Sequence, residues 1–205
     1  MVTDHHGGAI VGVLNLQGDV REHVAALEDV GCTRVRLIKR PPDLSGLAGL
    51  VLPGGESTTL SKLLESTGLF DVIADAIAGG LPVLGTCAGL VLLATEVLDG
   101  RPDQRSFGAL NVVVRRNGYG RQLQSFEGEV SWEAGEGPPL PAVFIRAPVI
   151  VSTAGDVDVL ARTADGTPVL VRQGQLVACS FHPELTPDRR VHHLFTDLCF
   201  AGVAR

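Results

Sequence analysis

The stretch Leu81–Ala94, LPVLGTCAGLVLLA, is almost wholly apolar, yet it holds a cysteine between two glycines. The apolar run up to Gly85 predicts a buried strand, and the run after Cys87 predicts a helix. G-x-C-x-G between a buried strand and a helix is the pattern of a nucleophile elbow, with cysteine in place of serine. The stretch therefore predicts an α/β architecture with a reactive side chain at the end of a strand.

A tight strand-to-helix turn explains the two glycines, because such a turn crowds the residues on either side of the cysteine. The N-terminus of the helix favours the thiolate form of Cys87. The amide of Ala88 points to where an oxyanion would form. A small cysteine packed in a tight turn is the other interpretation, and the elbow alone does not decide between the two.

The same region contains a run that is long enough to span a bilayer, because the twenty residues Ala76–Thr95 carry no charge. Two adjacent glycines, Pro82 and Gly85 interrupt the run, which a lipid-exposed helix does not easily tolerate. We therefore expect a helix end, a short buried strand, a turn and a helix start here, and no membrane as a partner.

Strand-like and helix-like segments alternate before this stretch. Strands are expected within 9–18, 34–38, 49–55 and 81–86, and helices within 19–31, 57–68, 69–80 and from Ala88 onward. Asp19 and Glu22 fit a capping box at the start of the first helix, and Gly31 fits its C-terminal stop. The alternation predicts a doubly wound, mostly parallel sheet flanked by helices, with ligands at the carboxyl ends of its strands.

After Gly100 the pattern changes to short strands with hairpin signals, followed by a last helix near 190–200. Strand-like segments fall at 110–117, 126–132, 142–151 and 157–181, with turns at Asp165-Gly166 and Gln173-Gly174. We expect these antiparallel strands to be additions to a single domain of residues 10–205. Residues 1–9 are expected to form a flexible N-terminal extension.

Composition narrows the class of function. The chain has 205 residues and a net charge of −6, which disfavours nonspecific binding to nucleic acid. Its four cysteines form no C-x-x-C pair, so we expect no structural zinc site and no bound metal. The start, MVTDHHGGAI, lacks the features of a signal peptide, and we expect a cytoplasmic protein.

A thiol nucleophile needs a base, and the segment CSFHPEL offers one. His182 follows a buried strand, and Glu184 lies two residues later, on the same side of an extended segment. Glu184 can accept a hydrogen bond from one imidazole nitrogen and leave the other nitrogen for the thiol. A loop His-Pro-Glu without a role is the alternative. His23 is expected on a helix, and His192-His193 on the last helix, solvated or packed.

Two further segments carry polar groups. LPGGEST, at 52–58, exposes backbone amides beside the elbow, which can complete an oxyanion hole, grip a polar substrate or simply lead into a helix. No G-x-x-x-x-G-K-[ST] motif supports a phosphate site. Arg115, Arg116 and Arg121 form a cluster that is either a solvated face or the source of one arginine for a substrate carboxylate.

Together, LPGGESTT, GTCAGL and HPE in this order resemble the class I glutamine amidotransferases that use a Cys-His-Glu triad. More narrowly, the chain resembles the glutaminase subunits of pyridoxal 5'-phosphate synthase from about Ile10 to Phe200. HPE alone is a weak signal, but six segments in one order are specific: LQGDVREH, LPGGESTT, GTCAGL, LNVVVRRNGYGRQ, FIRAP and CSFHPELT. The fold that the resemblance implies is the flavodoxin-like class I glutaminase fold.

The resemblance implies a role for each site residue and no cofactor. Cys87 attacks the side-chain amide of L-glutamine and forms a glutamyl thioester. His182 moves the protons, and Glu184 orients His182. The backbone of Gly54, Gly55 and Ala88 stabilises the oxyanion. The implied glutamine-binding residues are Gly54, Gly55, Glu56, Arg116, Ile145 and Arg146.

The resemblance also implies a partner, a (β/α)8-barrel synthase subunit that forms a ring decorated by glutaminase subunits. Ammonia passes to that subunit, which joins it to a pentose phosphate and a triose phosphate to make pyridoxal phosphate. The glutaminase is expected to be nearly silent until it docks. LQGDVREH resembles part of the docking surface and is expected to influence the oxyanion peptide.

The sequence departs from the family pattern at residues 1–9, at Asn15, where a small residue is expected, and at Arg115, where an acidic residue is common. These departures concern docking and activation rather than the triad.

Three rival interpretations stay open. One is a class I glutaminase of another pathway, such as histidine or purine synthesis, against which GGESTT, RRNGYGRQ and FIRAP argue. The second is a cysteine hydrolase or chaperone with a related elbow, in which a histidine would replace Ala88 after the cysteine. The third is a non-catalytic binding module, against which the intact set of Cys87, His182 and Glu184 argues.

Overall fold

The computed structural model describes residues 9–116, 118 and 125–201 of the chain. The strands of its main sheet are β1 Ile10–Leu14, β2 Val35–Ile38, β3 Leu47–Leu52, β4 Val83–Thr86, β10 Asp158–Arg162, β11 Pro168–Gln173 and β12 Leu176–Cys179. They lie in the order β10-β11-β12-β4-β3-β1-β2. The strands from β12 to β2 are parallel, whereas β10, β11 and β12 pair antiparallel. The expected α/β fold class is thereby confirmed.

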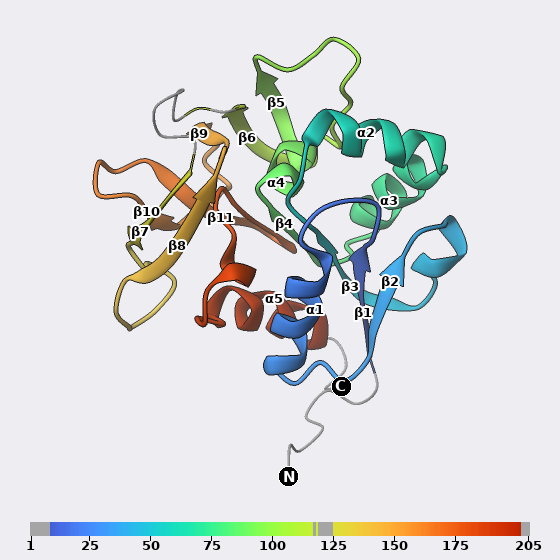
Figure 1. The fold of residues 1–205 in the computed structure, drawn as a ribbon, viewed down its shortest axis with the longest axis horizontal. Coiled ribbons are helices and arrows are strands. Elements are labelled where there is room, and N and C mark those ends of the chain that lie inside the picture. Colours follow the sequence, from blue (N-terminus) through green and yellow to red (C-terminus); the bar gives the residue numbers. More distant parts are fainter. Residues whose placement is uncertain (1–8, 117, 119–124, 202–205) are drawn as a thin grey trace.

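Helices cover both faces of this sheet, as Figure 1 shows. One face carries α1 (Val20–Asp29) and α5 (Arg190–Phe200), and the other carries α2 (Ser57–Ser66), α3 (Leu69–Ala78) and α4 (Ala88–Leu93). Each face has its own apolar cluster between helices and sheet. In the described part of the chain, every helix falls short of the length or the apolar character that a bilayer span requires.

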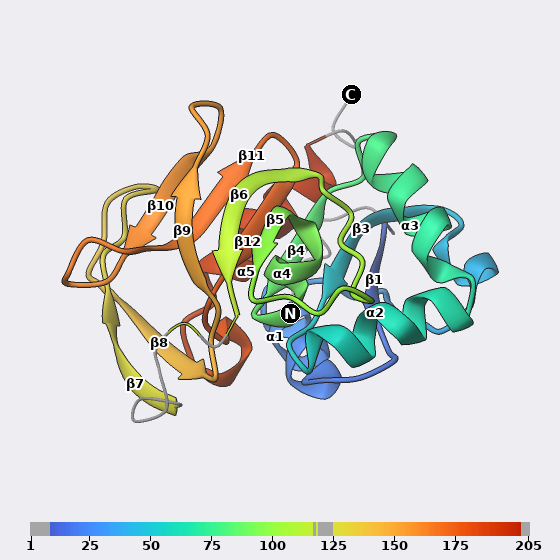
Figure 2. The ribbon, with the colours of Figure 1, turned by 90° about the horizontal axis from the view of Figure 1, so that it is seen from above.

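The C-terminal half adds two small sheets. The first joins β5 (Ala94–Leu98), β6 (Leu110–Arg115) and β9 (Val149–Thr153), and the second is the hairpin of β7 (Ser125–Val130) and β8 (Leu140–Ile145). Figure 2 shows this hairpin at the end of the molecule away from α2 and α3. The 3-10 turns are η1 (Pro41–Leu44) and η2 (Pro183–Leu185). Strand β5 is not among the strands expected from the sequence, because it follows α4 directly and no turn residue separates the two.

The first helix ends as expected but does not begin as expected. Gly31 has a φ of 87°, and the turn that it closes returns hydrogen bonds to the last carbonyls of α1. The predicted capping box is wrong. Asp19 occupies the N-cap position, yet its side chain makes no capping hydrogen bond. Its carboxylate lies instead 3.2 Å from Nδ1 of His182, so a tertiary contact replaces the local one.

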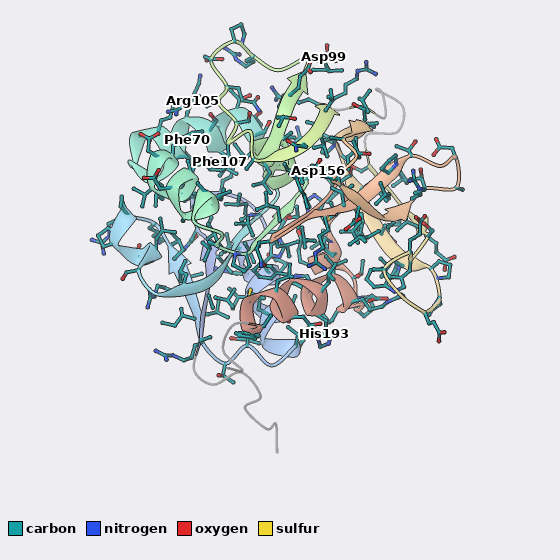
Figure 3. All side chains as sticks on the ribbon, turned by 180° about the vertical axis from the view of Figure 1, so that it is seen from behind. Phe70, Asp99, Arg105, Phe107, Asp156 and His193 are labelled. Atoms are coloured by element: carbon teal, nitrogen blue, oxygen red, sulfur yellow. The ribbon has the colours of Figure 1, made fainter. Side chains whose placement is uncertain are left out.

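The connection between β5 and β6 packs on α2 and α3. The guanidinium of Arg105 lies 3.8 Å from the ring centroid of Phe70, and the rings of Phe70 and Phe107 stack with centroids 4.6 Å apart (Figure 3). Such a cation–π stack holds a loop that has no regular structure of its own. It positions Gln104, whose amide oxygen accepts a hydrogen bond from Thr58 at the start of α2.

The turn from β4 to α4 passes close to the backbone of β3. An added Cβ at Gly89 would lie 2.1 Å from the carbonyl oxygen of Leu52, and one at Gly85 would lie 2.8 Å from the carbonyl carbon of Gly89. Backbone atoms cannot move aside as the end of a flexible side chain can. Both glycines of the G-x-C-x-G pattern are therefore needed for α4 to sit against the sheet.

We predict that Gly89→Ala lowers the free energy of unfolding by about 3 kcal/mol, because overpacking against a backbone that cannot yield is strongly destabilising. Gly128→Ala in β7 is the matched control, since an added Cβ there meets nothing within 4 Å. Urea unfolding followed by circular dichroism measures both variants. Equal transition midpoints would contradict the close packing described here.

Candidate active site

A pocket of about 300 Å³ lies at the carboxyl ends of the parallel strands. The loops that follow β1, β3, β4 and β12 meet there, together with the ends of β6 and β8. Its walls contain eight of the residues predicted for the site: Gly55, Glu56, Cys87, Ala88, Arg116, Ile145, Arg146 and His182. The other two, Gly54 and Glu184, contact the His182 ring. The structure thus brings all the predicted residues to one place.

Cys87 stands on a strained turn. Its φ of 49° and ψ of −100° fall in a backbone region that residues other than glycine rarely adopt. Holding a residue there costs about 1–3 kcal/mol of conformational free energy. The amide of Cys87 donates to the carbonyl oxygen of Cys179 at the end of β12, at 2.9 Å. The next strand of the sheet therefore holds the strained residue in place, with its thiol in the wall of the pocket.

His182 and Glu184 are almost fully buried and lie side by side. The backbone of His182 is held by a hydrogen bond from its amide to the carbonyl oxygen of Val143, at 2.8 Å. Glu184 Oε1 lies 2.7 Å from Nδ1 of His182. A carboxylate accepts only, so Nδ1 carries the proton and Nε2 is free to face the thiol. Cys87 and His182 line the same pocket, and Cys87 is among the groups that raise the pKa of His182.

The surroundings of His182 favour its charged form. Burial by itself lowers the pKa of His182, but the hydrogen bonds to Cys87 and Glu184 outweigh it and raise the pKa to about 10. The half-exposed carboxylate of Asp19 faces the same Nδ1 at 3.2 Å. An imidazolium in this position stabilises a neighbouring thiolate, which is the nucleophilic form of cysteine.

The glycine turn after β3 is packed from two sides. An added Cβ at Gly54 would lie 2.4 Å from Cε1 of His182, so the ring rests directly on the backbone. Gly18, in the loop after β1, has a φ of 99°, and its own Cβ would lie 1.8 Å from the carbonyl oxygen of Gly54. Gly55 has a φ of 144°, beside the side chain of Gln17. Any movement of the loop after β1 must therefore reach the predicted oxyanion peptide.

Glu56 and Arg116 form a charged pair in the pocket wall. Arg116 Nη2 donates to Glu56 Oε1 at 2.8 Å, and Arg116 Nη1 donates to Gln104 at 3.0 Å. Burial raises the pKa of Glu56, but hydrogen bonds from Thr59 and Thr58 outweigh it and hold the pKa at about 2. Glu56 is thus ionised and is also the N-cap of α2.

The arginine cluster divides between pocket and surface. Arg116 reaches the pocket with only 17% of its side chain exposed, whereas the side chain of Arg115 is 50% exposed and pairs with Asp99 at 3.5 Å. Arg121 lies outside the described residues. Opposite the elbow, the carbonyl oxygen of Ile145 lies 3.9 Å from Sγ of Cys87, and Arg146 follows with a φ of 44°.

Three further side chains lie at the site although none of them was predicted as a site residue. Gln17 and Asp19 line the pocket from the loop after β1, where no periodicity marks them. His23 is fully buried in α1 and lies 3.4 Å from Glu184. The sequence does contain a signal that His23 is buried. It lies three and four residues before the apolar Ala26 and Leu27, on the same buried face of α1.

The cluster around His182 also has the composition of a metal site. Asp19, His182 and Glu184 offer possible ligand atoms within 4.8 Å of one another. Both carboxylates face the same nitrogen, however, and that nitrogen carries a proton. Two carboxylates that face one protonated ring nitrogen are also the surroundings that suit an imidazolium.

The chain is similar to known proteins over nearly its whole length. The chain is 53% identical over 193 residues to the pyridoxal 5'-phosphate synthase subunit PdxT of Mycobacteroides abscessus, covering 94% of this chain and 98% of that one. It is 53% identical over 191 residues to the protein of the same name from Frankia alni, covering 93% and 95%. A crystal structure of a glutamine amidotransferase superposes with a TM-score of 0.85 at 46% identity, over 92% of this chain and 98% of the other. Residues 13–201 match a family description, and this match confirms the resemblance seen in the motifs: the chain belongs to the SNO glutamine amidotransferase family.

Proposed function

We propose that this chain is the glutaminase subunit of a pyridoxal 5'-phosphate synthase. It hydrolyses L-glutamine to L-glutamate and ammonia and passes the ammonia to a synthase subunit. One observation carries the proposal: Cys87 stands on a strained turn within reach of His182, which Glu184 holds at 2.7 Å. The relatives named as PdxT subunits support the pathway.

The chemistry follows from these positions. The Cys87 thiolate attacks the side-chain amide carbon of glutamine, and His182 gives its proton to the nitrogen that leaves as ammonia. The product of this step is a glutamyl thioester. His182 then takes a proton from water, whose oxygen attacks the thioester carbon, and glutamate leaves as the thiolate is restored. The amides of Gly54, Gly55 and Ala88 would stabilise the oxyanion of both tetrahedral intermediates.

The pocket wall carries the two charges that an α-amino acid requires. Arg116 is suited to the α-carboxylate of glutamine, and Glu56 is suited to its α-ammonium group. Ile145 and Arg146 form the wall opposite Cys87 and would place the side-chain amide against the thiol. Glutamine would thus be held at its charged end while its amide reaches the elbow.

The partner would be a (β/α)8-barrel subunit in a ring that carries glutaminase subunits, in the cytoplasm. Gly18 rests on the carbonyl of Gly54, and this contact supports a link between docking and activity. A partner that binds the loop after β1 would move or fix the oxyanion peptide. The chain alone would then hydrolyse glutamine slowly.

Reactivity should distinguish Cys87 from the other cysteines. Burial raises the pKa of Cys32 to about 11 and raises those of Cys179 and Cys199 still further. These three thiols stay protonated at pH 7, so we predict that iodoacetamide modifies native Cys87 alone. Mass spectrometry of the peptides measures the modification, and Cys87→Ala should take up no label. Labelling of Cys32 or Cys199 at a comparable rate would contradict the assignment.

Kinetic measurements can distinguish the proposed role of Arg116 from that of its neighbour Arg115. We predict that Arg116→Ala raises the KM for glutamine about tenfold or more, because it removes a charged hydrogen bond to the substrate. Arg115→Ala is the matched control, since the side chain of Arg115 lies on the surface with Asp99. Its KM should stay within about twofold of the wild-type value. A KM increase of the same size in both variants would argue against the role of Arg116.

Glutamate release from glutamine tests the function as a whole, with the purified chain alone and with its cognate synthase subunit. We expect the partner to raise the rate about tenfold or more and Cys87→Ala to abolish it. A rate that the partner leaves unchanged would indicate a class I glutaminase of another pathway. No glutamate in either mixture would indicate a binding module.

A further inference from the structure

A second group of polar side chains lies behind the triad and is completely buried. His23 of α1, Thr86 of β4 and His192 of α5 are each 0% exposed. His23 Nε2 lies 3.1 Å from the hydroxyl oxygen of Thr86 and 3.4 Å from Oε2 of Glu184. His23 Nδ1 lies 3.3 Å from Nε2 of His192. No step of the proposed chemistry uses these side chains.

The protons of this group can be placed by elimination. Glu184 Oε2 can only accept, and it has no conventional hydrogen bond within the described part of the chain. His23 Nε2 lies 3.4 Å from this oxygen and 3.1 Å from the hydroxyl oxygen of Thr86, so we place a proton on that nitrogen, facing both groups. His23 Nδ1 is then an acceptor, and His192 Nε2 donates to it. Nδ1 of His192 is left with a lone pair, and it has no partner among the described residues.

Burial keeps both of these rings neutral. Desolvation lowers the pKa of His23 despite the nearby Glu184, and it lowers the pKa of His192 to about 3. A neutral ring has one donor and one acceptor, so each histidine can hold only one tautomer in this chain of contacts. His23 therefore offers Glu184 a fixed N–H without adding a second positive charge beside His182.

We infer that His23 is a positioning residue of the catalytic triad and that His192 fixes its tautomer. The two oxygens of Glu184 are divided between two rings, with Oε1 on His182 and Oε2 facing His23. A buried carboxylate with a ring nitrogen close to each oxygen has little freedom to rotate. Through Thr86, which precedes Cys87, His23 also ties the carboxylate to the elbow. This role rests on the glutaminase function proposed above.

Asp19 makes such positioning necessary. Its carboxylate is 3.2 Å from Nδ1 of His182, only slightly farther than that of Glu184 at 2.7 Å. The carboxylate of Asp19 is half-exposed, whereas Glu184 is buried with His23 on its far side. If Glu184 lost its second contact, the His182 ring could turn toward Asp19 and away from the thiol. His23 thus keeps the buried carboxylate as the partner of the base.

Two amide substitutions at His23 separate positioning from packing. Glutamine places its NH₂ group near the position of Nε2 and keeps a donor for Glu184, whereas asparagine reaches only the position of Nδ1. We expect His23→Asn to lower kcat about tenfold to hundredfold with KM within about twofold, and His23→Gln to stay within about threefold of wild type. His193→Asn is the surface control, on the same helix as His192 and exposed (Figure 3).

The rate of Cys87 alkylation by iodoacetamide is a second readout that needs no glutamine. It should fall in the same order, with wild type and His23→Gln above His23→Asn. If wild type hydrolyses no glutamine but the alkylation order holds, the proposed function fails and the positioning role stands. Equal losses in the Asn and Gln variants, or no loss in either, would show that His23 only packs and would overturn the inference.

If His23→Asn does not fold, a matched pair of substitutions at His192 tests the same inference. Glutamine at this position keeps a donor for His23 Nδ1, and leucine removes it. We expect His192→Leu to lower kcat about threefold and His192→Gln to leave it unchanged, because His192 acts on Glu184 only through His23. Equal rates for the two variants would remove His192 from the chain of contacts.

Discussion

The close approach of backbone to backbone at the carboxyl edge of the sheet is the constraint on which the site depends. Gly89 lies against the carbonyl of Leu52, Gly54 against the ring of His182, and Gly18 against the carbonyl of Gly54. Each contact leaves no space for a side chain, so each fixes the distance between two loops. The loops after β1, β3 and β4 are therefore held as one body. That rigidity is what allows Cys87 to keep a backbone conformation that it would not adopt alone.

Much of this arrangement could be predicted from the sequence, because alternating apolar segments and glycine stops are local signals. The parallel strands, the helices between them and the elbow follow from such signals. What could not be predicted depends on contacts between distant residues. Asp19 has the residue type and position of a helix cap. In the structure, however, its carboxylate contacts His182 and makes no capping hydrogen bond. Strand β5 is hidden because it begins at Ala94, directly after the last residue of α4, with no turn residue between them.

The site shows the same division between local signals and distant contacts. The elbow marks Cys87, and the His-Pro-Glu segment marks its two proposed partners, because the proposed roles of nucleophile, base and orienting acid need particular residue types. Nothing in the local pattern separates Arg116 from its neighbour Arg115. Burial separates them, and burial depends on the packing of the connection that carries Gln104. His23 could have been noticed as a polar side chain on an apolar helix face, but its partner Glu184 is supplied by the fold.

The charged groups of the site surround the proton on Nδ1 of His182. Burial opposes the ionisation of Glu184, but His23 and His182 outweigh it and lower its pKa. The same carboxylate helps to raise the pKa of His182. Burying such a pair without good geometry costs stability, and the structure meets that condition by fixing both side chains from several elements. The loop after β12 must therefore hold His182 and Glu184 in a precise geometry, both for the stability of the fold and for the proposed chemistry.

The place of β12 in the main sheet bears on how the chain is made. β12 pairs with β4, with Cys179 opposite Thr86, although β4 ends at Thr86 and β12 begins only at Leu176. During synthesis the earlier strands and helices can form first, while β4 stays an open edge. Until β12 emerges and docks, Cys87 has neither the carbonyl that holds its turn nor a histidine beside it. The proposed Cys87–His182–Glu184 arrangement can therefore assemble only once folding is nearly complete, after β12 has docked against β4.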